Sequence, residues 1–233
     1  MNIKTKLEEI VNEESKMMDY FNEKRIDYCC NGYMTIEEVA KEKGLKAEDL
    51  LDMISDAFQE LKSSKPSQSM VTLEEFKTLN FKEMIDSILV DHHKKERDYL
   101  NSIDPLLNKI LIVHFDNHSE ELLELHKLFG SLKTELEEHF VKEEKISFPL
   151  ILNNPNPNEE IIKKIDELED DHESAGIIIK QMISLTDGFT PPEDACRTFK
   201  KTYSELDELT KDVFVHIFKE NSIMFKKFRE IRS

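Results

Sequence analysis

Residues 122–150 read LLELHKLFGSLKTELEEHFVKEEKISFPL, and this stretch decides the fold that we expect. Its leucines recur every three or four residues from Leu125 to Leu136, which predicts an amphipathic helix with one apolar face. His139 and Glu143 fall in the middle of that face. Side chains at positions i and i+4 of a helix lie about 5–6 Å apart at Cβ. This histidine and glutamate can therefore converge on one metal ion.

The same arrangement recurs in two other predicted helices. His172 lies on the apolar face of the helix over residues 158–185, and His216 and Glu220 lie on that of the helix over residues 192–230. Burying an unpaired polar group costs roughly 1–3 kcal/mol and an unpaired charge costs far more. We therefore expect these groups to satisfy one another or a metal. Imidazole and carboxylate ligands suit iron, manganese or zinc, and two glutamates from two helices could bridge a pair of metals.

The helix over residues 81–114 should supply the remaining ligand, and two neighbouring histidines compete for that role. On an ideal helical wheel His92 lies near the centre of the apolar face, and His93 lies nearly a quarter turn aside. A supercoil, a kink or a π-bulge would change this register. Periodicity alone therefore leaves both histidines open.

Few helix breakers interrupt the chain, with 5 glycines and 7 prolines in 233 residues, so the composition favours long helices over strands. We expect Pro105 to kink or split the first long helix. Strong turn residues at 153–158 and 186–194 predict loops. Long helices joined by short loops predict an all-α protein with an antiparallel four-helix bundle. The four long helices are predicted over residues 81–114, 118–150, 158–185 and 192–230.

A small helical unit is predicted before the bundle. Thr35 and Thr72 each open a capping box, Thr-x-x-Glu, and Gly44 stands where the helix after Thr35 should stop. Two further helices are expected over residues 4–24 and 47–62. The polar stretch at 62–69 is a plausible linker, so we predict domains over residues 1–64 and 72–233.

Charge and cysteine content exclude several classes of protein. Lys and Arg number 32 against 49 Asp and Glu, a formal charge of 32 − 49 = −17. Such an acidic surface repels nucleic acids and anionic membranes, and no apolar run is long enough to span a bilayer. The first residues, MNIKTKLEEI, are not expected to be a signal peptide. Three cysteines argue against a disulfide scaffold and favour a cytoplasmic location.

Some chemically capable residues are predicted to have ordinary roles. His114 and His118 lie at the expected turn between the first two long helices, where capping or surface roles are the simplest interpretation. Cys196 is interpreted as structural or incidental.

Six segments together resemble one known family, the iron-sulfur cluster repair di-iron proteins (the ScdA/YtfE or RIC group), which carry a hemerythrin-like domain. The segment DYCCNG at residues 27–32 resembles the signature of that family's small N-terminal domain. The other segments are similar to its ligand motifs and to a conserved-looking loop. They are ILVDHH at 88–93, HFVKEE at 139–144 followed by Phe148-Pro149, EDDH at 169–172, PPEDAC at 191–196 and HIFKEN at 216–221.

The resemblance implies an oxo-bridged pair of non-haem irons held by four histidines and two bridging glutamates. It places the first-helix ligand at His93, and tyrosine is usual in the family where His92 stands here. It also implies a redox or iron-transfer role for Cys29 and Cys30. One departure is the end of the last helix, where Met224-Phe225 stands in place of a usual Phe-Pro. The implied ligands are His93, His139, Glu143, His172, His216 and Glu220.

The resemblance further implies repair of iron-sulfur clusters damaged by nitrosative or oxidative stress, with damaged iron-sulfur proteins as partners and O₂ or nitric oxide as small ligands. Two alternatives remain: an enzyme that reduces nitric oxide, and a hemerythrin-like oxygen carrier or sensor. Whether the protein is an enzyme is left open, and a homodimer is one alternative for its assembly.

Overall fold

The computed structural model describes residues 1–63, 72–154 and 156–231. Within these ranges the chain is helical, without strands apart from one isolated bridge between Lys6 and Thr35. The described residues form two compact units. The N-terminal unit comprises residues 1–80 with 217–227, and the bundle unit comprises residues 81–216 with the segment from Phe228 onward.

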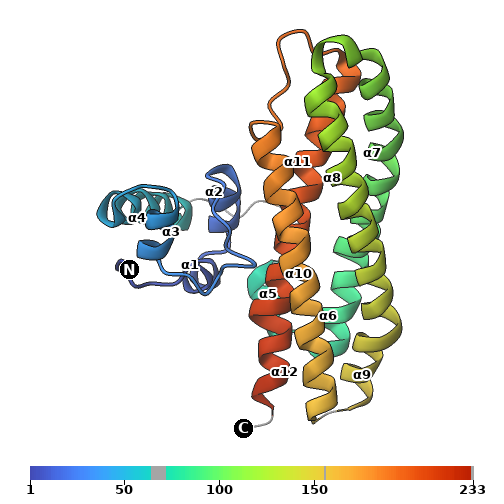
Figure 1. The fold of residues 1–233 in the computed structure, drawn as a ribbon. Coiled ribbons are helices and arrows are strands. Elements are labelled where there is room, and N and C mark those ends of the chain that lie inside the picture. Colours follow the sequence, from blue (N-terminus) through green and yellow to red (C-terminus); the bar gives the residue numbers. More distant parts are fainter. Residues whose placement is uncertain (64–71, 155, 232–233) are drawn as a thin grey trace. The chain divides into compact units, whose positions relative to one another are not determined.

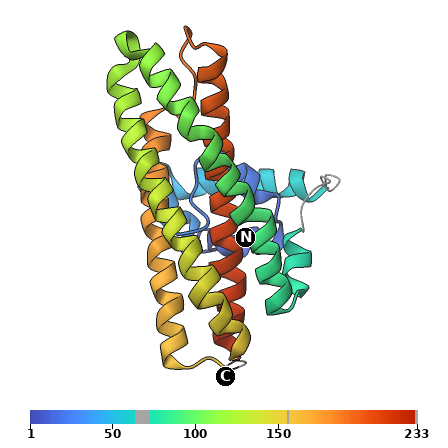
Figure 2. The same cartoon turned by 90° about the vertical axis from the view of Figure 1, so that its right-hand side faces the viewer.

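Four long helices of the bundle lie side by side in both views (Figures 1 and 2), which confirms the predicted all-α bundle. Three of the four contain a π-helical turn. The first runs through α6 (Phe81–Ile88), η1 (Leu89–His93) and α7 (Lys94–Val113), and the second through α8 (Phe115–Lys142), η2 (Glu143–Ser147) and α9 (Phe148–Asn153). The third is α10 (Glu159–Leu185), and the fourth runs through α11 (Arg197–Phe218), η3 (Lys219–Phe225) and α12 (Lys226–Glu230).

Two expectations for the long helices concern Pro105 and the start of the last helix. Pro105 lies inside α7 and does not split it, and the expected kink stays a prediction. Residue 101, whose carbonyl loses its partner there, is exposed, so water can satisfy it. The last helix begins at Arg197 rather than at 192, because Pro192 accepts from the Ala195 N–H in a turn before the helix.

The N-terminal unit is built from short helices. The expected helix over residues 4–24 is two helices, because Glu14 is extended, with φ −143° and ψ 100°. Both predicted capping boxes are present, at Thr35 and Thr72, and Gly44 ends its helix with φ 66°. The expected linker at 62–69 falls mainly outside the described residues. The helices are α1 (Leu7–Glu13), α2 (Met17–Glu23), α3 (Ile36–Glu42), α4 (Ala47–Ser63) and α5 (Leu73–Thr78).

Aromatic side chains and one lysine join the segments of the N-terminal unit. Tyr28 is fully buried, and its ring centroid lies 6.0 Å from that of Phe21 and 5.7 Å from that of Phe218. The Lys227 Nζ donates to the Leu79 carbonyl at 2.7 Å. The unit therefore includes part of the last long helix as well as the first 80 residues.

Candidate metal centre

The π-helical turns decide which side chains face the core at one level of the bundle. A π turn adds one residue to a helical turn, so the buried positions after it shift by one. In the first helix both His92 and His93 are buried within η1, and the buried positions continue at Glu96 and Leu100. The ideal wheel therefore misjudges His93, which the real register places in the core.

The second helix shows the same shift after η2. A plain α-helix would place Ile146 on the apolar face, but its side chain is 46 % exposed. Ser147 and Phe148 are buried instead. Glu143, at the first position of the π turn, remains fully buried. The π turn thus holds this carboxylate in the core and turns the next helical segment by one position.

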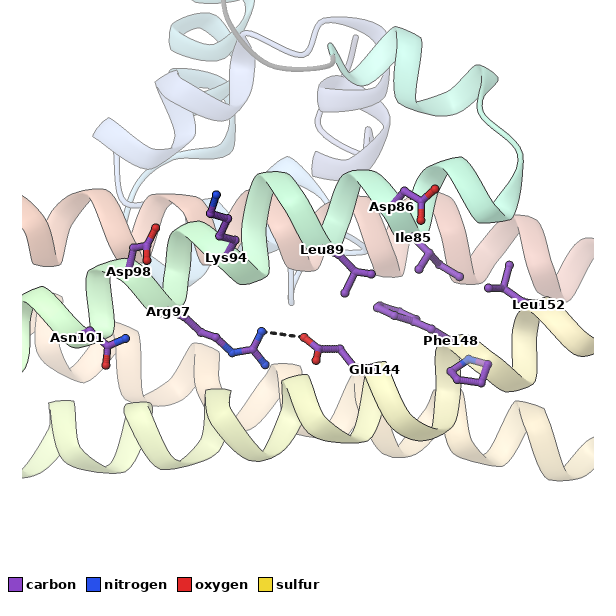
Figure 3. Close-up of a pocket in the computed structure, with 11 residues that line it drawn as sticks. Ile85, Asp86, Leu89, Lys94, Arg97, Asp98, Asn101, Glu144, Phe148 and Leu152 are labelled. Atoms are coloured by element: carbon purple, nitrogen blue, oxygen red, sulfur yellow. Dashed lines mark hydrogen bonds and ion pairs between the residues drawn. The ribbon is translucent and has the colours of Figure 1, made fainter.

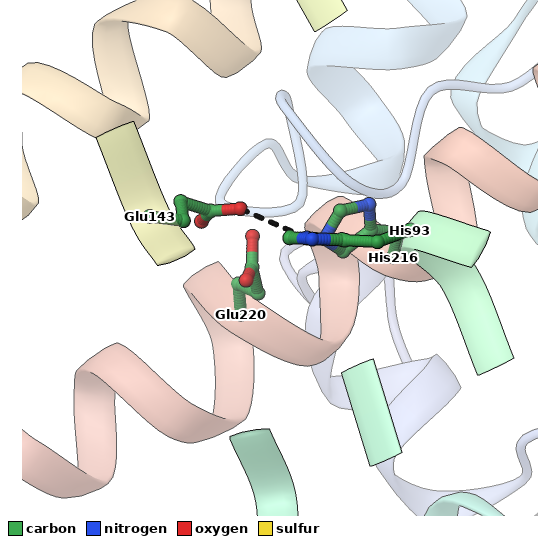
Figure 4. A group of neighbouring side chains, drawn as sticks. All are labelled: His93, Glu143, His216 and Glu220. Carbon is green, nitrogen blue, oxygen red and sulfur yellow. Dashed lines mark ion pairs between the residues drawn. The ribbon is translucent and has the colours of Figure 1, made fainter. Parts of the chain in front are cut away.

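Six side chains that the sequence singled out lie together as two groups of possible metal ligands. Within each group one ligand atom from every residue lies within 4.8 Å of the others. One group contains His93 and His216 with the two glutamates (Figure 4), and the other contains His139 and His172 with the same two glutamates. All six side chains are buried. Two groups that share both carboxylates, Glu143 and Glu220, have the pattern of two neighbouring metals with bridging ligands.

Individual distances fit the donor set of a metal. The Glu143 Oε2 lies 3.1 Å from the His93 Nε2 and 3.2 Å from the His139 Nε2, and the Nε2 atoms of His139 and His172 are 3.0 Å apart. Adjacent ligands of an octahedral metal, each about 2.1 Å from the ion, are separated by about 3 Å. Imidazole nitrogens and carboxylates at these separations fit iron, manganese or zinc.

Carboxylates on the far side of three imidazoles hold these rings in place. The Nδ1 of His93 lies 2.9 Å from the Glu144 Oε1, and the Nδ1 of His216 lies 3.2 Å from both oxygens of Glu96. The Nδ1 of His139 lies 3.7 Å from the Asp171 carboxylate. A carboxylate that accepts from Nδ1–H leaves Nε2 free of a proton and directed at the centre.

Two of these outer carboxylates are held ionised. The nearby His139 imidazole and Lys142 ammonium lower the pKa of Asp171 to about 2. Burial opposes ionisation of Glu144, but Arg97 and His93 outweigh it and lower the pKa of this carboxyl. Both groups therefore keep a negative charge beside their histidines at neutral pH.

His92 is buried but faces away from both groups. Its Nδ1 lies 3.1 Å from the Asp212 Oδ2, and the Lys95 Nζ donates to the other Asp212 oxygen at 2.7 Å. The His92 ring is stacked on that of His216, with centroids 5.2 Å apart and planes within 6°. His93 thus lies within one of the two donor groups, whereas His92 lies in a separate group with Glu96 and Asp212.

A pocket of about 630 Å³ lies beside the centre (Figure 3). Arg97 and Glu144 line it, and the Arg97 guanidinium donates to the Glu144 Oε1 at 2.8 Å. That same oxygen contacts the His93 Nδ1. Glu144 therefore contacts both the pocket and His93, a candidate metal ligand.

In the N-terminal unit, Cys29 and Cys30 are reduced thiols with their Sγ atoms 3.7 Å apart. Asp27 organises them, because its Oδ1 accepts from the backbone N–H groups of Cys29 at 3.2 Å and Cys30 at 3.0 Å. Cys29 is buried, which raises the pKa of its thiol well above the usual value, and Cys30 is half-buried. These two thiols and the Asp27 carboxylate form a further group of possible ligands.

Sequence reasoning did not find the outer partners Glu96, Asp171 and Asp212. Glu96 is fully buried, and on an ideal wheel it already falls on the apolar face between Ile85 and Ile103, a signal that sequence reasoning did not use. Asp171 stands in an acidic run beside His172 and gives no separate signal. Glu135, one turn before His139, is exposed and takes no part in this outer layer.

Comparisons with known proteins agree with this geometry. The hemerythrin HHE cation binding domain family matches residues 84–228, and the ScdA_N family, a domain of unknown function, matches residues 3–57. The iron-sulfur cluster repair protein ScdA of Staphylococcus haemolyticus is 29% identical, over 94% of this chain and 96% of the relative. YtfE of an Enterobacter species, also an iron-sulfur cluster repair protein, is 32% identical over 89% and 88%. A probable iron-sulfur cluster repair protein of Haemophilus influenzae is 30% identical over the same shares.

One further finding concerns membranes. In the part of the chain that the structure describes, every helix is too short or too polar to cross a bilayer.

Proposed function

Because this chain belongs to the family of iron-sulfur cluster repair proteins with a hemerythrin HHE cation-binding domain, we propose that it is a di-iron protein that helps to restore damaged iron-sulfur clusters by supplying iron. The observation that carries the proposal is the pair of donor groups that share both glutamates. Two irons are the simplest occupants of such an arrangement.

In this proposal the ligands divide evenly between the two irons. His93 and His216 bind one iron, His139 and His172 bind the other, and Glu143 and Glu220 bridge them. Bound iron supplies ferrous–ferric redox chemistry and binding of diatomic molecules. An oxo bridge between the irons, as the resemblance implies, is part of the proposal.

The protein's own side chains set the conditions for this chemistry. Glu144, Glu96 and Asp171 orient three of the imidazoles through Nδ1, as outer partners of metal-bound histidines usually do. The buried surroundings exclude water from the donors. The pocket beside Arg97 and Glu144 is an opening from which a small molecule could approach His93.

Cys29 and Cys30 are proposed to serve iron transfer or a redox step. Cys30 is half-buried and therefore accessible, whereas Cys29 is buried with a raised pKa. A thiol binds ferrous iron only after losing its proton. Cys30 is accordingly the better candidate for the first contact with iron or with a damaged protein, and Cys29 for a supporting role. A cytoplasmic location, expected from reduced cysteines, belongs to the same proposal.

The first test measures iron content and the optical spectrum of anaerobically purified protein. We expect two irons per chain and the bands of an oxo-bridged pair after oxidation. The repair test adds iron-loaded protein to a dehydratase whose cluster has been damaged by nitric oxide. Activity should return faster than with the same amount of free ferrous iron. Equal recovery in the two cases would reject iron supply as the function.

Glu143→Ala tests whether repair depends on the donor groups, because this substitution removes a carboxylate from both of them. Its iron content and its repair activity should fall together. Replacing Cys29 and Cys30 with serine should leave the iron content unchanged and lower the repair activity. If repair survives both cysteine replacements, the thiols take no part in iron transfer.

Reduction of nitric oxide is a second candidate, favoured by the pocket beside His93. Consumption of nitric oxide by the iron-loaded protein, with an electron donor, would support it. If the iron-loaded protein does not consume nitric oxide under those conditions, this candidate function is rejected. A carrier or sensor of O₂ has no use for the thiols of the N-terminal unit, so the serine replacements above also separate it from repair.

A further inference from the structure

A second cluster of possible ligands lies at one end of the bundle unit. His114 caps the junction of α7 and α8, and His118 follows one turn later. Asp194 and Cys196 come from the connection that leads into α11. We call these four residues the end cluster. His114 and Cys196 are 82 positions apart in the sequence, and His118 and Asp194 are 76 apart, but the folded chain brings them together.

The donor atoms of the end cluster are close together. Ligand atoms of His114, His118 and Asp194 lie within 4.8 Å of one another. The His118 Nε2 lies 2.9 Å from the Asp194 Oδ1, and the His114 Nε2 lies 3.3 Å from the Cys196 Sγ. In a tetrahedral zinc site with ordinary bond lengths, neighbouring N and O donors are roughly 3.4 Å apart and N and S donors roughly 3.6 Å. The His118–Asp194 and His114–Cys196 pairs need to separate by only a few tenths of an ångström to accept an ion, and the Cys196 Sγ must also approach the remaining donors, because it lies outside the group within 4.8 Å.

A buried aromatic ring fixes both imidazoles. Phe199 is fully buried, and its ring meets the His114 ring edge-on, with centroids 5.2 Å apart and planes at 89°. The Phe199 and His118 ring centroids lie 5.9 Å apart at 69°. The two histidines thus have a rigid support, although the cluster itself reaches solvent.

The surroundings of Cys196 favour the thiolate, which is the form that binds metal. The hydrogen bond with His114 is the largest cause, and the Phe199 backbone N–H donates to the Sγ at 3.4 Å. Together they lower the pKa of Cys196 to about 7. A fraction of the protein therefore carries a ready thiolate at neutral pH.

We propose that the end cluster is a second metal site, which binds one Zn²⁺ ion through His114, His118, Asp194 and Cys196. Two imidazoles, a carboxylate and a thiolate are all ordinary zinc ligands, and four of them complete a tetrahedron. Along the helix from residue 93 to residue 114, at about 1.5 Å per residue, the site lies roughly 30 Å from the central donor groups. It is therefore independent of the proposed irons.

Cobalt tests the site, because Co²⁺ replaces Zn²⁺ and reports thiolate ligation through a charge-transfer band. The titration uses iron-loaded full-length protein in which Cys29→Ser and Cys30→Ser leave Cys196 as the single thiol. One Co²⁺ per chain should bind with a thiolate band, and added Zn²⁺ should displace it. Adding Cys196→Ser should abolish the band, and His118→Ala should weaken binding at least ten-fold. A band that persists without Cys196, or the absence of any band, overturns the proposal.

A second measurement uses the unmodified sequence and so does not depend on a variant that folds. Alkylation of Cys196 by iodoacetamide is followed by mass spectrometry of its peptide, with and without one equivalent of Zn²⁺. Bound zinc should slow this alkylation at least ten-fold. Equal alkylation rates of Cys196 with and without zinc would also overturn the proposal.

Discussion

The central donor groups and the end cluster use similar ligands in opposite surroundings. At the centre no donor residue is more than 4 % exposed, whereas Cys196 and Asp194 of the end cluster are exposed. A buried charge without a partner costs several kcal/mol, but an exposed one is satisfied by water. Occupancy of the centre should therefore be linked to the stability of the bundle, and occupancy of the end cluster should not.

Removal of metal gives the largest expected contrast. A ligand present at 1,000 times its dissociation constant stabilises the folded state by about 4 kcal/mol, which for a chain of this size raises the melting temperature by on the order of 10 °C. Calorimetry of iron-loaded protein before and after anaerobic chelation should show a loss of this size. The same comparison for zinc at the end cluster should give a much smaller shift. Equal shifts would mean that burial does not separate the two sites.

Paired histidine variants test the register at the centre. His93→Ala should lower the iron content from two towards one per chain, because the His93 Nε2 faces the Glu143 carboxylate at 3.1 Å. His92→Ala should retain both irons, since its Nδ1 faces Asp212 instead. Iron analysis and the optical spectrum distinguish the two. If His92→Ala alone loses iron, the ideal wheel is right and the π-shifted register is wrong.

The outer carboxylates should have a smaller effect. Glu96→Gln keeps the size of the side chain but removes the charge that faces the His216 Nδ1 at 3.2 Å. Loss of such a partner typically weakens metal binding 10–100-fold, so we expect faster iron loss to a chelator without collapse of the fold. Glu135→Gln, at an exposed position, is the control and should release iron at the wild-type rate.

The smallest effect concerns the pH dependence of the thiols. The pKa of Cys196 is lowered to about 7, so its thiolate is fully formed above that pH and is lost as the pH falls through 7. At pH 7 it should be alkylated roughly five-fold faster than an ordinary cysteine, since the gain in thiolate is partly offset by lower nucleophilicity. Cys29, whose pKa is raised by burial, should stay unreactive. Mass spectrometry across pH 5–9 measures both, and a Cys196 midpoint near 9 would contradict the assigned contacts.

These differences also explain how much the sequence could predict. The apolar stripes and the His-x-x-x-Glu pairs at His139 and His216 are local patterns, so they revealed the long helices and five of the six central residues. The choice between His92 and His93 depended on a π turn, which leaves no clear mark in periodicity. The family resemblance, rather than the wheel, indicated His93.

The end cluster lay beyond the reach of sequence reasoning for a different reason. His114 and Cys196 are 82 residues apart, and His118 and Asp194 are 76 apart. Neither helix periodicity nor turn chemistry specifies which two loops meet at the end of a bundle. His114, His118 and Cys196 therefore seemed ordinary until the folded chain brought them together.

The three π turns have a consequence for how this bundle tolerates change. η1, η2 and η3 all coincide with proposed ligands, at His93, Glu143 and Glu220. Each acts as a phase shift of about 100° between the helical segments before and after it. If such a turn closed into a plain α-helix without losing a residue, everything beyond it would rotate and a side chain such as Ile146 would be buried in place of Ser147. Deleting one residue together with the turn would instead keep the flanking faces in register and lose only the local widening beside the proposed ligand.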